Sequence, residues 1–159
     1  MRIFRKKVPA QSTVLSFGEL FQLTDNWDFA VGLREILANE CDGNGQPTNM
    51  GHVKRVLFLC MMIEDAGQAD MIFNFFDEFP AYIDEVVDAL FEIGAPKSAE
   101  LIRDAVALLP ADGVSITYAE YPREWDLISE IDAKFADYPD GRMRDLCRKY
   151  AEAHKGDFL

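Results

Sequence analysis

The sequence has few of the residues from which metal sites, redox centres and disulfide frameworks are built. It contains three cysteines and two histidines in 159 residues. The number of cysteines is odd and no two of them form a CxxC pair; they are Cys41, Cys60 and Cys147. We therefore expect no disulfide framework and a reducing compartment. His52 and His154 lack a second histidine, cysteine or acid at ligand spacing on their own predicted helices, which argues against a zinc site.

Long apolar runs are also missing. The longest uninterrupted run covers the eight residues 56–63, whereas a membrane-spanning helix needs about 20. The first residues are basic, but the apolar stretch of a signal peptide does not follow them. The sequence therefore predicts a cytoplasmic protein without a membrane segment.

Local signatures of catalysis are absent as well. There is no glycine-rich phosphate loop, no GxSxG motif, and no serine or cysteine close in sequence to a histidine. The loop from Glu40 matches the first positions of a calcium-binding EF-hand, but its twelfth position is Gly51, where a bidentate glutamate is required. We therefore expect no catalytic residues, no metal and no cofactor, and a protein that is not an enzyme.

Positive charge is missing from a long central part of the chain. No Lys or Arg lies between Arg55 and Lys97, and the same stretch carries nine Asp and Glu residues. The net charge of the whole chain is −12. Four of its 16 basic residues lie within residues 2–7, which leaves 12 bases against 28 acids in residues 11–159. A protein with this excess of negative charge repels phosphate backbones, so we expect no direct binding to nucleic acid. A basic protein partner is compatible with this charge.

The residues that are present favour an all-α fold. Hydrophobic residues make up 49% of the chain, enough for a core, and they recur at helical rather than alternating spacing. We predict a basic N-terminal arm, 1–12, and one domain, 13–159, folded as a compact bundle of about six or seven helices, with a short extended piece at 114–118. The predicted helices cover residues 26–40, 50–67, 68–79, 80–93, 96–109, 122–138 and 141–155. In the first of these, the residues expected to face the core are Trp27, Ala30, Val31 and Leu37.

The clearest helical pattern lies between Pro80, a favourable first helical residue, and Gly94, a favourable residue after the last. The apolar residues expected to be buried there are Tyr82, Ile83, Val86, Val87, Leu90 and Phe91. On the side of the helix away from these apolar residues, the acids Asp84, Asp88 and Glu92 are spaced at i, i+4 and i+8. Like charges at this spacing each cost an isolated helix about 0.2–0.5 kcal/mol, so we expect compensation from another part of the chain or from a partner.

Acids on the neighbouring predicted helices extend this charge. The candidate partner-binding residues are Asp77, Glu78, Asp84, Glu85, Asp88, Glu92, Glu100 and Asp104; we call these eight side chains the acidic surface. Three explanations remain open: a solvated helix face, pairing with the basic ends of the same chain or of a second copy, and binding of another protein. The basic residues near the C-terminus are Arg142, Arg144, Arg148, Lys149 and Lys155.

Residues 75–110, FFDEFPAYIDEVVDALFEIGAPKSAELIRDAVALLP, resemble the core of the DNA-mimic-protein-like family, a small all-helical bacterial domain. The positions that carry the resemblance are Ala89, Leu90, Ile93, Gly94, Ala95 and Ala99. The segments IDAKF, 131–135, and RKYAEAHKGDF, 148–158, are similar as well, so the resemblance covers residues from about 50 to 159. One stretch departs from the family: members carry Asn-Gly-Gly-Phe after the glutamate of the central helix, and this chain reads Asp65-Ala66-Gly67-Gln68 after Glu64.

The resemblance implies an acidic and often dimeric protein whose carboxylates imitate the phosphates of duplex DNA. Such a protein occupies the DNA-binding face of a transcription regulator. We therefore expect an acidic protein-interaction module that binds a basic DNA-binding protein and can form a homodimer. The alternative is a helical domain with a regulatory or immunity role, whose acidic face serves solubility or self-association.

Overall fold

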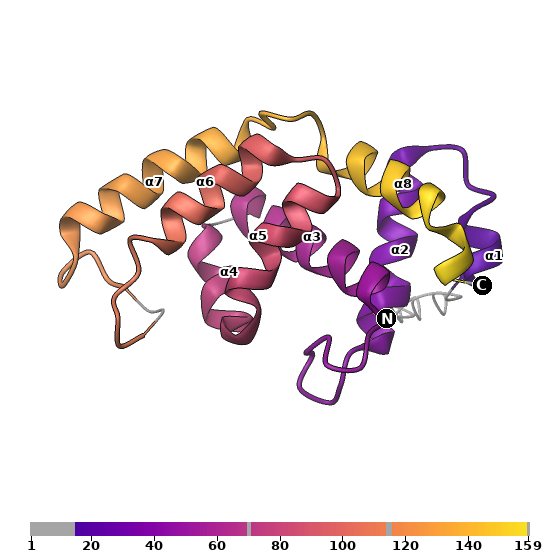
Figure 1. The fold of residues 1–159 in the computed structure, drawn as a ribbon, viewed down its shortest axis with the longest axis horizontal. Coiled ribbons are helices and arrows are strands. Elements are labelled where there is room, and N and C mark those ends of the chain that lie inside the picture. Colours follow the sequence, from indigo (N-terminus) through magenta and orange to yellow (C-terminus); the bar gives the residue numbers. More distant parts are fainter. Residues whose placement is uncertain (1–14, 70, 114–115, 159) are drawn as a thin grey trace, which may run out of the picture.

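The computed structural model describes residues 15–69, 71–113 and 116–158. Within these ranges the chain forms eight α-helices and two 3₁₀ helices and no β-strand (Figure 1). Along the chain they are α1 (Phe17–Leu20), α2 (Asn26–Glu40), α3 (His52–Ala69), α4 (Ile72–Glu78), η1 (Pro80–Tyr82), α5 (Ile83–Glu92), α6 (Pro96–Val106), α7 (Pro122–Ala136), α8 (Met143–Ala153) and η2 (Lys155–Asp157). The predicted all-α fold is confirmed, and the one α-helix that was not expected is the four-residue α1.

Two predictions fall wholly or partly outside the described ranges. The basic arm, 1–12, lies among residues 1–14, so the division into an arm and one domain stays a prediction. The extended piece at 114–118 is described only from residue 116, and residues 116–118 form no strand. None of the described helices combines the length and apolar character needed to cross a membrane.

The central helix is α3, as its apolar run predicts. It buries residues 56–61 and Ile63 and packs against α2, α4, α5, α7 and α8. Figure 1 shows α1, α2 and α8 gathered at one end of the molecule, while α6 and α7 extend toward the other end. One hydrophobic core joins these elements across the described residues.

The beginnings and ends of several helices follow from local chemistry. The Asp25 carboxylate accepts hydrogen bonds from the backbone N–H groups of Trp27, at 2.8 Å, and Asp28, at 3.1 Å, and so caps α2. After α5, Gly94 adopts a φ of +87°, a left-handed conformation that glycine takes without steric cost. Pro96 then begins α6, so the α5–α6 connection is as short as the sequence predicts.

The predicted buried face of α2 is confirmed at Leu37 and wrong at Trp27 and Val31. Trp27 is 61% exposed and Val31 43% exposed, whereas Phe29 is buried. Gly32 explains the difference, because a Cβ at this position would lie 3.0 Å from Leu20 Cδ1. The missing side chain lets the α1 segment pack closely against the Phe29–Gly32 side of α2, and this contact turns the Trp27 side outward.

On α5 the predicted buried face is confirmed in its centre and wrong at its end. Val86 and Leu90 are fully buried, but Phe91 is 40% exposed. Ala89 is buried instead. Because α5 packs against both α3 and α6, its buried face is wider on the Ala89 side than the apolar pattern indicates.

Gly67 lies inside the last turns of α3 and not in a turn between helices. This is the stretch in which the sequence departs from the family pattern after Glu64. A Cβ on Gly67 would lie 2.7 Å from Cδ1 and 2.9 Å from Cε1 of Phe135, a buried residue of α7. The glycine therefore allows α3 and α7 to approach each other closely.

We expect Gly67→Ala to destabilise the protein by about 1 kcal/mol. Overpacking against the Phe135 ring costs about 1–3 kcal/mol, and the higher helix propensity of alanine returns up to about 1 kcal/mol. Urea unfolding would measure the difference. Gly18→Ala in α1 is the matched control, because its Cβ would meet only Ser16 Oγ at 3.8 Å; a Gly67→Ala protein as stable as this control would contradict the packing argument.

Candidate functional site: an acidic surface and a separate pocket

The acidic surface is spread over three consecutive helices. Asp77 and Glu78 end α4, four of the acids lie on α5, and Glu100 and Asp104 lie on α6. All are exposed except Glu85, which is half-buried. Asp84 and Asp88 lie one turn apart on the solvent side of α5.

Three acids of this surface have partners within the chain. Arg55, near the start of α3, donates from Nε to Glu85 Oε1. Glu100 pairs with Arg103 on its own helix. Glu92 is held by His52, whose Nε2 lies 2.9 Å from Oε2, and by a hydrogen bond from the Tyr150 hydroxyl of α8. The expected compensation from another part of the chain is therefore found for part of this stretch. Arg55 balances the charge of Glu85, and hydrogen bonds with His52 and the neutral Tyr150 hydroxyl stabilise that of Glu92.

The environment of Glu92 stabilises its charged form. Burial alone would raise the pKa of Glu92, but the hydrogen bonds from Tyr150 and His52 outweigh it, and the pKa lies below its usual range. A carboxylate with a lowered pKa stabilises the fold at pH values above its unfolded-state pKa, which is about 4.5. This contribution to stability is lost as the pH falls through the folded-state pKa.

Tyr150→Phe should raise the pKa of Glu92, because it removes one hydrogen bond to the carboxylate and leaves the burial in place. The stability that Glu92 contributes above about pH 4.5 should shrink accordingly. NMR titration of the Glu92 side chain would measure the pKa directly. Tyr118→Phe is a suitable control, since Tyr118 is 59% exposed, and an unchanged Glu92 pKa in Tyr150→Phe would contradict the assigned contact.

The remaining acids of the surface are Asp77, Glu78, Asp84, Asp88 and Asp104. Within the described ranges, no residue donates a hydrogen bond to their carboxylates or forms an ion pair with them. Asp104 lies beside a shallow hollow that is also lined by Lys97 and Lys134, so positive charge is near it. As far as the described residues show, the uncompensated part of the surface is thus on α4 and α5.

Basic side chains from α8 and η2 contact aromatic rings rather than this surface. The Arg148 guanidinium lies 4.2 Å from the centre of the Phe29 ring, and Arg144 lies 5.6 Å from the Trp27 ring. Lys155 Nζ lies 5.0 Å from the Phe21 ring. These three residues therefore pack on the α1–α2 end of the molecule, and the described structure does not use them to cover the acids on α4 and α5.

The sequence model of the DMP19-like protein family matches residues 51–154. The chain belongs to this family. The match confirms the resemblance to the DNA-mimic-protein-like family and runs from the start of α3 to the end of α8, so it includes all eight acids of the acidic surface. No curated protein and no solved structure matches the chain.

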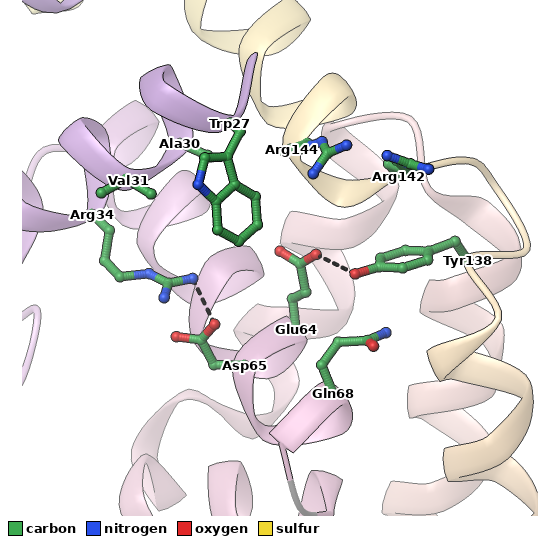
Figure 2. A pocket seen from close by; sticks show the side chains of 10 residues that line it. All are labelled: Trp27, Ala30, Val31, Arg34, Glu64, Asp65, Gln68, Tyr138, Arg142 and Arg144. Carbon is green, nitrogen blue, oxygen red and sulfur yellow. Dashed lines mark hydrogen bonds and ion pairs between the residues drawn. The ribbon is translucent and has the colours of Figure 1, made fainter. Parts of the chain in front are cut away.

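A pocket of about 340 Å³ lies apart from these eight acids (Figure 2). Its walls come from α2, from the C-terminal part of α3, from the α7–α8 connection at Tyr138 and Arg142, and from Arg144 in the first turn of α8. The α2 wall precedes the part of the chain that the DMP19-like family model covers. Sequence reasoning missed the pocket, because three segments far apart in the chain build it and none carries a motif of its own.

Charged groups of both signs meet in this pocket. Arg34 Nη2 donates to Asp65 Oδ1 at 2.5 Å, and the Tyr138 hydroxyl donates to Glu64 Oε1 at 2.9 Å. Burial raises the pKa of Glu64, although the hydrogen bond from Tyr138 opposes the shift. Burial also raises the pKa of Tyr138 to about 12, and the Glu64 carboxylate adds to it. Glu64 is therefore a partly desolvated carboxyl group in the wall of the pocket.

Proposed function

We propose that this chain is an acidic protein-interaction module that acts as a DNA mimic and binds the basic, DNA-contacting face of a transcription regulator. The observation that carries the proposal is a group of exposed carboxylates on α4 and α5 that have no hydrogen-bonding or ion-pairing partner among the described residues, namely Asp77, Glu78, Asp84 and Asp88. Membership of the DMP19-like family supports the same function.

Charge provides the physical basis of the interaction. Asp84 and Asp88 repel each other across one helical turn, at a cost of about 0.2–0.5 kcal/mol, and a basic surface would remove this cost. The net charge of −12 would also steer a positively charged partner toward the protein and increase the association rate. A helical protein with this surface can thus compete with DNA for a basic site without resembling DNA in its backbone.

The test is capture of partners from a bacterial lysate at low salt on the immobilised chain, followed by mass spectrometry. We expect recovery of a DNA-binding protein that duplex DNA releases by competition. Raising the salt from 0.1 to 1 M shortens the screening length from about 10 to about 3 Å and should also release it. A captured protein that resists both DNA and salt would contradict the mimic.

Recovery of no DNA-binding protein would favour the alternative, in which the acidic surface serves solubility or self-association. Sedimentation of the purified chain at low and high salt then becomes informative. Self-association through the acidic surface and a basic region of a second copy would weaken as the salt concentration rises.

A further inference from the structure

The pocket between α2, α3 and residues 138–144 has an apolar wall that faces solvent. Trp27 and Val31, one turn apart on α2, both line it and are 61% and 43% exposed. They are two of the four large hydrophobic residues that are exposed in the described part of the chain. Figure 2 shows the Trp27 ring leaning over the centre of the pocket. An exposed indole beside a cavity provides a flat surface on which an apolar or aromatic group can pack.

Positive charge lies on one side of this wall. Figure 2 shows Arg142 and Arg144 next to each other above Glu64 and Tyr138. Arg144 is 4.0 Å from Asp145, a long contact for an ion pair, and the Arg142 guanidinium has no hydrogen bond or ion pair with any described residue. The planar guanidinium group binds carboxylates through two parallel hydrogen bonds. These two side chains can therefore hold a carboxylate at the mouth of the pocket.

Negative charge lies in the middle of the pocket. Glu64 Oε1 accepts from Tyr138, while Oε2 accepts no hydrogen bond from the described residues, and Figure 2 shows the carboxyl group directed into the space below Trp27. Because this carboxylate is partly desolvated, a cationic donor placed beside it would be bound more strongly than at the protein surface. Asp65 is less available, since Arg34 already occupies its Oδ1.

We propose that this pocket binds a free α-amino acid with an apolar or aromatic side chain. Arg142 and Arg144 hold the carboxylate, Glu64 accepts from the ammonium group, and Trp27 and Val31 contact the side chain. A ligand with a carboxylate alone is repelled by Glu64, and a ligand with an amine alone is repelled by the arginines, so the arrangement selects a zwitterion. The volume of about 340 Å³ suits a ligand of this size. This site is separate from the acidic surface and does not depend on the proposed function.

The test is calorimetric titration of the full chain with L-phenylalanine, N-acetyl-L-phenylalanine and L-phenylalaninamide, and with L-leucine for an aliphatic side chain. The second compound lacks the ammonium charge and the third lacks the carboxylate. We expect L-phenylalanine or L-leucine to bind, and each phenylalanine derivative to bind at least about tenfold more weakly than L-phenylalanine, because each loses one charge-assisted hydrogen-bonding group. Absence of binding by both free amino acids at millimolar concentration would overturn the proposal, as would equal binding of L-phenylalanine and its two derivatives.

Variants separate the contributions of the walls. Trp27→Ala and Arg142→Met should each weaken binding of L-phenylalanine about tenfold or more. Their matched controls are Tyr118→Ala and Arg123→Met, which change exposed residues outside the pocket and should bind as the unmodified chain does. If a control weakens binding as much as its pocket variant does, the location is wrong.

Glu64→Gln gives the sharpest result. Glutamine retains an oxygen that accepts from Tyr138, so the fold of the wall is preserved, while the negative charge is removed. This variant should bind L-phenylalanine and N-acetyl-L-phenylalanine with similar affinity, because the ammonium group no longer gains an ion pair and the acetylated ligand is no longer repelled. An unchanged preference for the zwitterion would overturn the role of Glu64. None of these variants touches the acidic surface, so capture of a DNA-binding partner should be unaffected by them.

Discussion

Neutralising Asp77, Asp84 and Asp88 together, as Asp77→Asn, Asp84→Asn and Asp88→Asn, should weaken binding of the captured partner by about tenfold to a hundredfold. Exposed charge pairs contribute about 0.2–1 kcal/mol each, and pairs that become partly buried in an interface contribute more. A loss of 1.4 kcal/mol is a tenfold change in affinity. The residual binding should also depend less on salt, because fewer ion pairs form. Surface plasmon resonance at several salt concentrations would measure both quantities.

The choice of these three acids follows from their contacts. Replacing Glu85 with a neutral residue would remove the ion-pair partner of Arg55, and replacing Glu92 would remove the partner of His52 and Tyr150. A change in binding after those substitutions could then arise from a changed structure. The three aspartates are exposed and form no hydrogen bond or ion pair with a described residue, so their substitution tests the surface alone.

A control with the same loss of charge is Glu35→Gln, Asp126→Asn and Glu130→Gln. These acids are exposed on α2 and α7 and lie outside the acidic surface. The control should keep most of the affinity, since only long-range steering is reduced by three charges. Equal losses in both triple variants would mean that net charge, and not the α4–α5 acids, determines binding.

Several helices could be predicted from the sequence because their ends are encoded locally. Asp25 supplies the cap of α2 through its own carboxylate, and Gly94 supplies the left-handed residue that ends α5. Pro96 and Pro122 begin α6 and α7, at the first positions predicted for them. Each of these signals involves residues within a few positions of one another, so no knowledge of the tertiary structure is required.

The pairing of the acids could not be predicted in this way. Arg55 reaches Glu85 across 30 positions, and Tyr150 reaches Glu92 across 58. A count of charges along the chain showed a stretch without basic residues, but it could not show that the first turns of α3 lie against α5. The same limit applies to Trp27, which an apolar pattern places in the core and which packing at Gly32 turns toward solvent.

Asp140→Ala should destabilise the protein by about 2 kcal/mol and lower the melting temperature by roughly 4–8 °C. No side chain within α6 caps its N-terminus, since the preceding residue is Ala95 and the first is Pro96. The Asp140 carboxylate does so from the α7–α8 connection, accepting from the backbone N–H groups of Lys97, at 3.1 Å, and Ser98, at 2.7 Å. Its negative charge also interacts favourably with the positive end of the helix dipole.

Asp140 further connects this cap to the pocket. Asp140 lies two residues after Tyr138, which has a φ of 54°, and two residues before Arg142. Both of these pocket residues therefore flank the point at which the α7–α8 connection is attached to α6. Removing the attachment should weaken binding of L-phenylalanine without changing any residue that lines the pocket. Asp140→Asn retains one side-chain oxygen as an acceptor and should lose less stability than Asp140→Ala. Equal stability of Asp140→Ala and the unmodified chain in thermal unfolding would show that water satisfies the α6 N–H groups as well as the carboxylate does.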